Sequence, residues 1–231
     1  MTDLVRVWVI PADVPAGTEA SCRAVLDAGE RARAEALRNP RDRHVFTVAH
    51  GAVRILAARE LETRPAALSW TPGPHGKPEL AGLHTNLSHS ADLIAVAIST
   101  SRPVGVDVQA LVPGLDTAGL AARYFLADEA RYVAEGLDAG MRADRFAHLW
   151  ARKEAVVKAA GGRLWPNLKI AVRASDVVSC ADPAGGSGGT HRVADIAAPP
   201  GYRAAVALTG AAPFTAAVAA WPGQRFMIAD F

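Results

Sequence analysis

The sequence contains few cysteines and no long hydrophobic run. Its two cysteines, Cys22 and Cys180, match no metal-binding or thioredoxin-type spacing and no disulfide framework, so we interpret both as incidental thiols in a reducing compartment. The longest apolar run, residues 210–221, is too short to span a bilayer and contains Pro213. The N-terminal residues lack the apolar core of a signal peptide. These absences predict a cytoplasmic protein that does not enter a membrane.

An excess of charge of one sign is also absent. The 231 residues include 25 basic and 23 acidic side chains, and the formal net charge of +2 argues against bulk binding of nucleic acid. Five arginines lie between Arg31 and Arg43; most fit a solvated helical face, although one or two could form a local anion site. Lysine is scarce, which suggests that each one is needed as a compact ammonium. The lysines are Lys77, Lys153, Lys158 and Lys169.

Hydrophobic periodicity predicts two similar sets of helices and strands. The chain is half hydrophobic, enough for a sizeable core. We predict a pair of similar α+β halves, 1–103 and 104–231, related by a pseudo-twofold axis, with a seam near Pro103. The first half has predicted strands at 5–10, 85–87 and 93–99, helices at 18–37 and 41–61, and a loop at 71–78. The second has strands at 104–108, 168–173, 191–196, 202–208 and 214–220, and helices at 117–124, 127–137 and 142–160.

The helix predicted at 142–160 carries a row of side chains beside its apolar stripe. Trp150, Glu154 and Lys158 follow one another at four-residue spacing, which places the last two at the edge of the buried face. A Glu/Lys pair at this spacing is most often a surface salt bridge worth roughly 0.3–0.5 kcal/mol. The neighbouring tryptophan and the scarcity of lysine weaken that interpretation and leave a functional pair open.

The strand predicted at 104–108 has one apolar and one polar face. Gly105, Asp107 and Gln109 share the face opposite the valines, where the glycine admits a close backbone or a ligand. This is either an ordinary solvent face or, together with a helix carboxylate, a site for a hard cation. Magnesium needs only a few protein oxygens because waters and substrate phosphates complete its shell.

Two short segments offer donors for phosphate oxygens. Asn86-Leu87-Ser88-His89-Ser90 carries hydroxyls and an imidazole between two predicted strands, and could also be a simple satisfied turn. Gly76-Lys77-Pro78 places a lysine on a loop, where backbone amides and an ammonium can meet an anion.

Together these segments resemble the Sfp-type 4′-phosphopantetheinyl transferases. The resemblance spreads over roughly residues 30–170, and four motifs in the family's order make it specific. The matching motifs are Gly76-Lys77-Pro78, Asn86-Leu87-Ser88-His89-Ser90, Val104-Gly105-Val106-Asp107-Val108 and Trp150-Ala151-Arg152-Lys153-Glu154-Ala155-Val156-Val157-Lys158.

The resemblance implies an enzyme that moves the 4′-phosphopantetheine arm of coenzyme A onto a serine of an apo acyl or peptidyl carrier protein. It also implies release of adenosine 3′,5′-bisphosphate, and an active site in the cleft between two α+β halves. The family serves polyketide, nonribosomal peptide, fatty-acid and lysine pathways. We expect the carrier to contact residues 121–135, the chain to be a monomer, and neither nucleic acid nor a membrane to be a partner.

The resemblance also assigns roles to residues. By position, Glu154 and Lys158 would be catalytic: Glu154 as the base for the incoming serine, kept ionised by Lys153 and Lys158, and Lys158 against the splitting diphosphate. Metal ligands for Mg²⁺ or Mn²⁺ would be Asp107, Gln109 and Glu154. Residues that bind coenzyme A would be Arg31, Arg43, Lys77, Ser88, His89, Asp107 and Lys158.

One departure from the family pattern concerns the metal site. The family commonly has a glutamate where this chain has Gln109, whose neutral carbonyl oxygen binds a cation more weakly or through water. Two other functions remain open from the residues alone. One is a Mg²⁺-dependent nuclease or phosphodiesterase, and the other is a non-enzymatic module that binds a nucleotide or a carrier protein.

Overall fold

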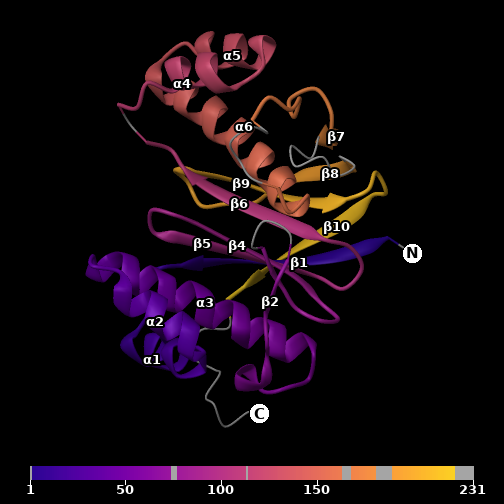
Figure 1. Ribbon diagram of the computed structural model, residues 1–231. Coiled ribbons are helices and arrows are strands. Elements are labelled where there is room, and N and C mark those ends of the chain that lie inside the picture. Colours follow the sequence, from indigo (N-terminus) through magenta and orange to yellow (C-terminus); the bar gives the residue numbers. More distant parts are fainter. Residues whose placement is uncertain (1, 74–76, 113, 163–167, 181–188, 222–231) are drawn as a thin grey trace.

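The computed structural model describes residues 2–73, 77–112, 114–162, 168–180 and 189–221. Two β-sheets lie at the centre of the molecule, with one group of helices outside each sheet (Figure 1). The mixed α+β class predicted from the sequence is confirmed. In the part of the chain that the structure describes, none of the helices is long and apolar enough to cross a membrane.

The first half of the chain forms one strand, a helical layer and a hairpin. The predicted helix at 18–37 is instead two helices, because the chain leaves the helical conformation at Leu26 and Asp27 then caps the second helix, with a capping box closed by Glu30. The elements are β1 (Asp3–Pro11), α1 (Ala16–Val25), α2 (Ala28–Ala36), α3 (Pro40–Glu60), the 3₁₀ turn η1 (Pro65–Ala67), β2 (Thr71–Pro72), β3 (Pro78–Glu79), β4 (His84–Ser90) and β5 (Leu93–Ser99). The predicted loop at 71–78 therefore contains all of β2 and the first residue of β3, two very short strands.

The second half repeats this order of a strand, helices and a hairpin. Its elements are β6 (Val104–Ala110), α4 (Thr117–Tyr124), α5 (Ala127–Ala134), α6 (Ala139–Ala159), β7 (Val177–Cys180), β8 (Gly189–Ile196), β9 (Tyr202–Thr209) and β10 (Phe214–Ala220). Each agrees with its predicted position to within a few residues, except for β7, which was not predicted.

The strand predicted at 168–173 is wrong. The segment keeps the alternating burial of a strand, with Leu168, Ile170 and Val172 buried, but its backbone groups bond to side chains instead of a neighbouring strand. The amide of Val172 donates to Glu129, and the carbonyls of Ile170 and Val172 accept from Lys153 and Arg152. The alternating pattern therefore predicted the burial of the side chains correctly. The segment is not a strand because its backbone hydrogen bonds go to side chains of distant helices.

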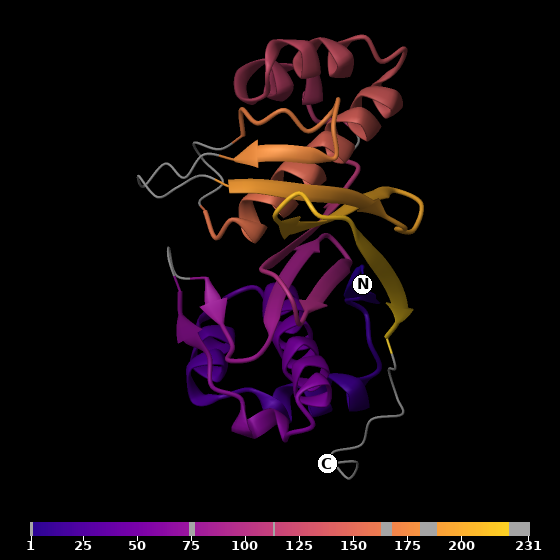
Figure 2. The same cartoon turned by 90° about the vertical axis from the view of Figure 1, so that its right-hand side faces the viewer.

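The two sheets have related strand orders. The first sheet runs β10-β1-β5-β4 and the second runs β6-β9-β8-β7. In each, the first strand of the half pairs antiparallel with the second strand of the hairpin. The pseudo-twofold axis itself and the division at residue 103 stay predictions. The last strand, β10, leaves the second half and pairs parallel with β1, so it crosses from one sheet to the other (Figure 2).

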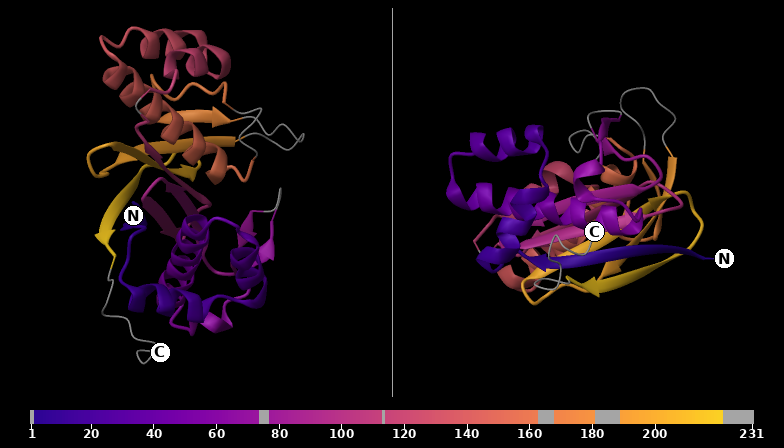
Figure 3. Two further views of the ribbon diagram at one scale, coloured as in Figure 1. Left: turned by 90° about the vertical axis from the view of Figure 1, so that its left-hand side faces the viewer. Right: turned by 90° about the horizontal axis from the view of Figure 1, so that it is seen from below.

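The core is divided into three layers by these sheets. Alternation along β1 sends Val5 and Val7 to the layer between the sheets, whereas Trp8 and Ile10 face α3. A third layer lies between the second sheet and α6, with α4 and α5 packed outside that helix (Figure 3). The two sheets thus share one apolar layer, and β4 and β6 bring their polar residues to its edge.

Candidate active site

The site begins with a close approach of α6 to β6. Gly105 is buried, and a Cβ atom there would lie 2.1 Å from the carbonyl oxygen of Ala155 and 2.4 Å from the amide nitrogen of Ala159. Only glycine allows the helix to lie directly on the strand at this point. The close backbone that the sequence left open is therefore this helix, which carries Glu154 and Lys158 to the same face as Asp107.

Four side chains meet where β4, β6 and α6 come together. Lys158 Nζ donates to Asp107 Oδ1 at 2.6 Å and to Ser88 Oγ at 3.0 Å, and lies 3.2 Å from Glu154 Oε2. Ser88 Oγ donates to the same Asp107 oxygen at 2.6 Å. The structure therefore brings together four of the residues that the sequence assigned to one site.

Burial dominates the electrostatics of this cluster. The side chain of Asp107 is only 3% exposed, and burial raises its pKa to about 7, because the ion pair with Lys158 offsets the loss of solvent only in part and Glu154 adds repulsion. Burial alone would lower the pKa of Lys158, but Asp107 and Glu154 raise it above its ordinary value. The ammonium therefore stays charged while the buried carboxyl group titrates near neutrality.

The edge strands β4 and β6 are joined by side chains. Asn86 Oδ1 accepts from the amide of Val106 at 2.9 Å, and Ser90 Oγ accepts from the amide of Ala110 at 3.0 Å. Asn86, Ser88 and Ser90 alternate along β4, so the three share the face turned to β6. Asn86 and Ser90 are site-building residues that the sequence reasoning did not assign; their spacing of two was the available signal.

Lys77 connects the loop before β3 to the same place. Its Nζ donates to the carbonyl oxygens of Lys158 at 2.7 Å and Val104 at 3.0 Å. Burial lowers the pKa of Lys77 to about 8. Lys77 therefore holds the end of α6 against β6, and the preceding Gly76 of its motif lies outside the described residues.

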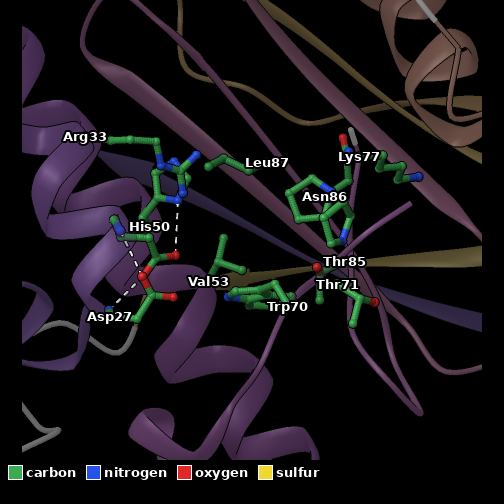
Figure 4. Close-up of a pocket in the computed structure, with 13 residues that line it drawn as sticks. Asp27, Arg33, His50, Val53, Trp70, Thr71, Lys77, Thr85, Asn86 and Leu87 are labelled. Atoms are coloured by element: carbon green, nitrogen blue, oxygen red, sulfur yellow. Dashed lines mark hydrogen bonds and ion pairs between the residues drawn. The ribbon is translucent and has the colours of Figure 1, made fainter. Parts of the chain in front are cut away.

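A pocket of roughly 440 Å³ opens beside the cluster, between α2, α3 and β4 (Figure 4). Arg33 and His50 reach into it from the helices, and Lys77 lies on the opposite side. Asn86 lines the pocket and also bonds to β6 next to Asp107, so the pocket lies beside the cluster, whose own side chains are not among the lining residues. Aromatic, apolar and cationic walls of this size suit a nucleotide. Its walls include Glu30, Val53, Trp70, Thr85 and Leu87.

Comparisons with known proteins agree with this geometry. A family model described as the 4′-phosphopantetheinyl transferase superfamily matches residues 103–199, which include β6 and α6. The 4′-phosphopantetheinyl transferase HetI of Nostoc sp. is 33% identical over 167 residues, or 70% of each chain. The chain belongs to the 4′-phosphopantetheinyl transferase superfamily. The prediction of a phosphopantetheinyl transferase is thus confirmed at the level of the family.

Two further relatives show how much of each protein's length the similarity covers. A 4′-phosphopantetheinyl transferase of Bacillus subtilis is 30% identical over 177 residues, covering 74% of this chain and 77% of that protein. The protein slr0495 of Synechocystis sp., which carries a provisional 4′-phosphopantetheinyl transferase name, is 35% identical over 161 residues. That alignment covers 68% of this chain and 64% of the relative, so the chain spans less than two thirds of that protein.

The donor set fits a hard divalent cation in this family member. Asp107 Oδ2 is buried and has no hydrogen-bond partner, so one carboxylate oxygen is available beside Glu154. Gln109 Nε2 donates a hydrogen bond to the carbonyl of Ala110 at 3.2 Å, which leaves the side-chain oxygen of Gln109 as a possible ligand for a cation. Within the described residues, no cluster of three or more His, Cys, Asp or Glu side chains could hold a metal. Gln109 lies two residues after Asp107 on β6, so a metal site here would combine two carboxylates with this amide.

Lys153 serves a different part of the transferase-family fold. Its Nζ is fully buried, donates to Glu129 Oε2 and to the carbonyl of Ile170 at 2.5 Å each, and lies 4.8 Å from the Phe125 ring centre. Lys153 is therefore engaged with Glu129 and Ile170 in the core, and its expected influence on Glu154 stays a prediction.

The remaining predicted anion-binding residues lie around α2, α3 and β4. Arg31 is exposed on α2, and Arg43 donates through Nε and Nη2 to the carbonyl of Leu37. His89 lies on β4, facing away from Ser88, and partial desolvation together with nearby Lys158 lowers its pKa. Among the described residues that line the pocket, the arginine is Arg33, not Arg31 or Arg43.

Proposed function

We propose that the chain is an Sfp-type enzyme that transfers the 4′-phosphopantetheine group of coenzyme A to a serine of an apo carrier protein. Adenosine 3′,5′-bisphosphate is the second product. The proposal rests on family membership together with one observation: a nucleotide-sized pocket lies beside the carboxylate-lysine cluster, and two of its lining residues, Asn86 and Lys77, bond to the backbone of Val106 and Lys158. If the nucleotide of coenzyme A binds in the pocket, a diphosphate that extends from it along β4 would reach Ser88 and Lys158 first.

The proposed metal ligands are Asp107, Glu154 and Gln109. The free Asp107 oxygen and the unfilled shell that a small cation keeps for phosphates support this assignment. Bound Mg²⁺, or Mn²⁺, would supply positive charge against the diphosphate. Gln109 would contribute its amide oxygen, directly or through water.

The catalytic roles fall to Glu154 and Lys158. Glu154 accepts the proton of the incoming serine hydroxyl, and its side chain is 18% exposed, which leaves it accessible to solvent. Lys158 donates to the diphosphate oxygens as charge builds on the leaving phosphate, and the raised pKa of this lysine keeps it protonated. Serine oxygen forms the new bond to phosphorus as the bridging oxygen of the diphosphate leaves.

The nucleotide is proposed to lie in the pocket. Trp70 offers an aromatic wall for a base, and Arg33, His50 and Lys77 offer cationic or neutral donors for phosphates. Arg31, Arg43 and His89 would complete the anion site from the rim. Ser88 would contribute through the hydroxyl that already bridges Asp107 and Lys158.

The partner and its surroundings are also proposals. We place carrier-protein docking on residues 121–135, which span α4 and α5 outside α6, and expect a monomer in the cytoplasm. Polyketide or nonribosomal peptide synthesis is the pathway class proposed from the resemblance.

A transfer assay tests the proposal. The protein is incubated with coenzyme A, Mg²⁺ and a panel of apo carrier proteins, and each carrier is weighed by mass spectrometry. We expect a gain equal to the phosphopantetheine arm, lost with EDTA and reduced at least about 100-fold in Glu154→Gln. The matched control, Lys169→Gln, changes an exposed lysine and should retain transfer. No gain on any carrier, or an undiminished gain in Glu154→Gln, would contradict the proposal.

A further inference from the structure

The ammonium group of Lys158 is surrounded by oxygen atoms. It lies 2.6 Å from Asp107 Oδ1, 3.0 Å from Ser88 Oγ, 3.2 Å from Glu154 Oε2 and 3.3 Å from the carbonyl oxygen of Val106. These oxygens come from β4, β6 and α6. An oxygen shell drawn from three elements is the arrangement in which proteins hold a cation.

The ammonium also neutralises half of the negative charge at the site. Asp107 and Glu154 together carry two negative charges when both are ionised, and Lys158 contacts both carboxylates. A divalent ion that uses the free Asp107 oxygen and Glu154 must therefore approach an existing positive charge. At separations of a few ångströms in a partly buried site, that repulsion is large enough to change affinity by an order of magnitude.

We propose that Lys158 is a built-in counter-cation that keeps the affinity of the free enzyme for divalent metal low, until a diphosphate offers the ammonium new partners. The inference rests on the proposed function for the identity of the diphosphate. Lys158 then has two successive sets of partners, the carboxylates before substrate binds and the diphosphate oxygens afterwards. Its side chain is 26% exposed, which leaves room for this movement.

The experiment measures metal binding without coenzyme A. Mn²⁺ is titrated into the purified protein at pH 8, and the free ion is followed by electron paramagnetic resonance. We expect Lys158→Gln to bind Mn²⁺ at least about tenfold more tightly than the wild type, because the neutral amide removes the repulsion. Lys158→Arg retains the charge and should stay within about threefold of the wild type, as should the control Lys169→Gln. Equal or weaker Mn²⁺ binding by Lys158→Gln would overturn the inference. Tighter Mn²⁺ binding by Lys158→Arg would also count against it, because the effect would then come from the size of the side chain and not from its charge.

A chemical rescue guards against a variant that folds poorly. In Lys158→Ala, ethylammonium can enter the vacated position, so it should weaken Mn²⁺ binding more than an equal concentration of tetramethylammonium, which has no N–H donor. An equal effect of the two ions would count against the inference. Thermal melts of all variants show whether each is folded under the conditions of the titration.

The two proposals fail separately. If the wild type modifies carriers but Lys158→Gln gains no Mn²⁺ affinity, the counter-cation inference is wrong and the transfer function stands. If Lys158→Gln binds Mn²⁺ tightly but no carrier is modified, the metal site and its lysine stand while the transfer function fails.

Discussion

At the scale of single residues, Asp107 has two oxygens with different surroundings. Oδ1 accepts from Lys158 and Ser88, whereas Oδ2 is buried without a partner. An unsatisfied buried oxygen is costly, so its persistence at this position indicates a functional demand. Two donors hold Oδ1, which leaves Oδ2 as the oxygen through which Asp107 would hold the proposed cation.

Gln109 is the residue whose replacement should strengthen that site. In Gln109→Glu a third carboxylate faces the cation, and we expect the Mg²⁺ concentration for half-maximal transfer to fall about tenfold with the maximal rate within about threefold. A Mg²⁺ titration of the transfer rate measures this. The control is Gln109→Ala, for which we expect a higher Mg²⁺ requirement. If all three proteins need the same Mg²⁺ concentration, Gln109 has no role at the metal.

The scarcity of lysine predicted the importance of these residues but not their partners. Lys153 and Lys158 are five residues apart, about 140° around a helix, so they cannot serve the same neighbour. One reaches Glu129 in the core and the other reaches Asp107. Spacing within α6 paired Glu154 with Lys158 correctly, because both lie on that helix. The partner of Lys153 comes from α5, and no local pattern encodes it.

At the scale of elements, the catalytic geometry depends on how closely α6 lies on β6. In Gly105→Ala the new methyl group would overlap the backbone of Ala155, so the helix must shift. We expect a loss of roughly 1–3 kcal/mol in the free energy of unfolding. The transfer rate should fall at least about tenfold, because the helix carries Glu154 and Lys158 away from Asp107.

Urea unfolding and the transfer assay measure the two effects. Gly17→Ala in α1 is the matched control, since nothing lies within 4 Å of a Cβ placed there. A Gly105→Ala enzyme with normal rate and stability would mean that the helix is free to move without consequence.

A second contact between elements holds the wall of the pocket. Arg54 of α3 is buried; it donates through Nε to Glu30 at 2.5 Å, and also contacts Asp27 and the carbonyls of Pro65 and Leu68. Burial would raise the pKa of Glu30, but hydrogen bonds from His50, the Asp27 amide and Arg54 lower it to about 2. The ionised Glu30 therefore stabilises the packing of α2 on α3.

This shift predicts how stability depends on acid. Since the folded pKa of Glu30 is below its unfolded value of 4.5, the stabilisation is present above about pH 4.5 and is lost as the pH falls to about 2. The drop of about 2.5 pKa units corresponds to about 3 kcal/mol. We expect Glu30→Gln to be less stable than the wild type at pH 7 and to approach it near pH 2. The control is Glu35→Gln, which changes an exposed residue of α2. Urea unfolding measures the free energy of unfolding at each pH. A difference between wild type and Glu30→Gln that stays constant from pH 7 to 2 would contradict the assignment.

Local patterns predicted most elements of the fold, and their failures have physical reasons. The alternation of apolar side chains predicted β1, β5, β6 and β9, because these strands are half or fully buried and are bounded by sequence signals for turns. The capping box at Asp27 was present in the sequence but was hidden inside a continuous helical pattern. The segment around Ile170 has strand-like burial, yet its hydrogen bonds go to Lys153, Glu129 and Arg152, which are distant in sequence.

At the scale of the whole molecule, the two halves are interdependent. The apolar layer between the sheets draws Val5 and Val7 from β1 and Val106 and Val206 from β6 and β9. The last strand, β10, belongs to the second half in sequence and to the first sheet in space. Because the catalytic cluster uses β4 from one half and β6 with α6 from the other, each half supplies an incomplete site.

This interdependence predicts the behaviour of separated halves. Fragment 1–103 lacks β10 and exposes the inner face of its sheet, so we expect it to unfold without a cooperative transition when produced alone. Mixing it with fragment 104–231 should restore a cooperative melt, because the shared layer and the β1–β10 pairing can both form between chains. Circular dichroism melts of each fragment, of the mixture and of the intact chain measure this. A cooperative melt of fragment 1–103 alone would show that the first half is a domain in its own right, and that the site lies between two independent units instead of within one shared core.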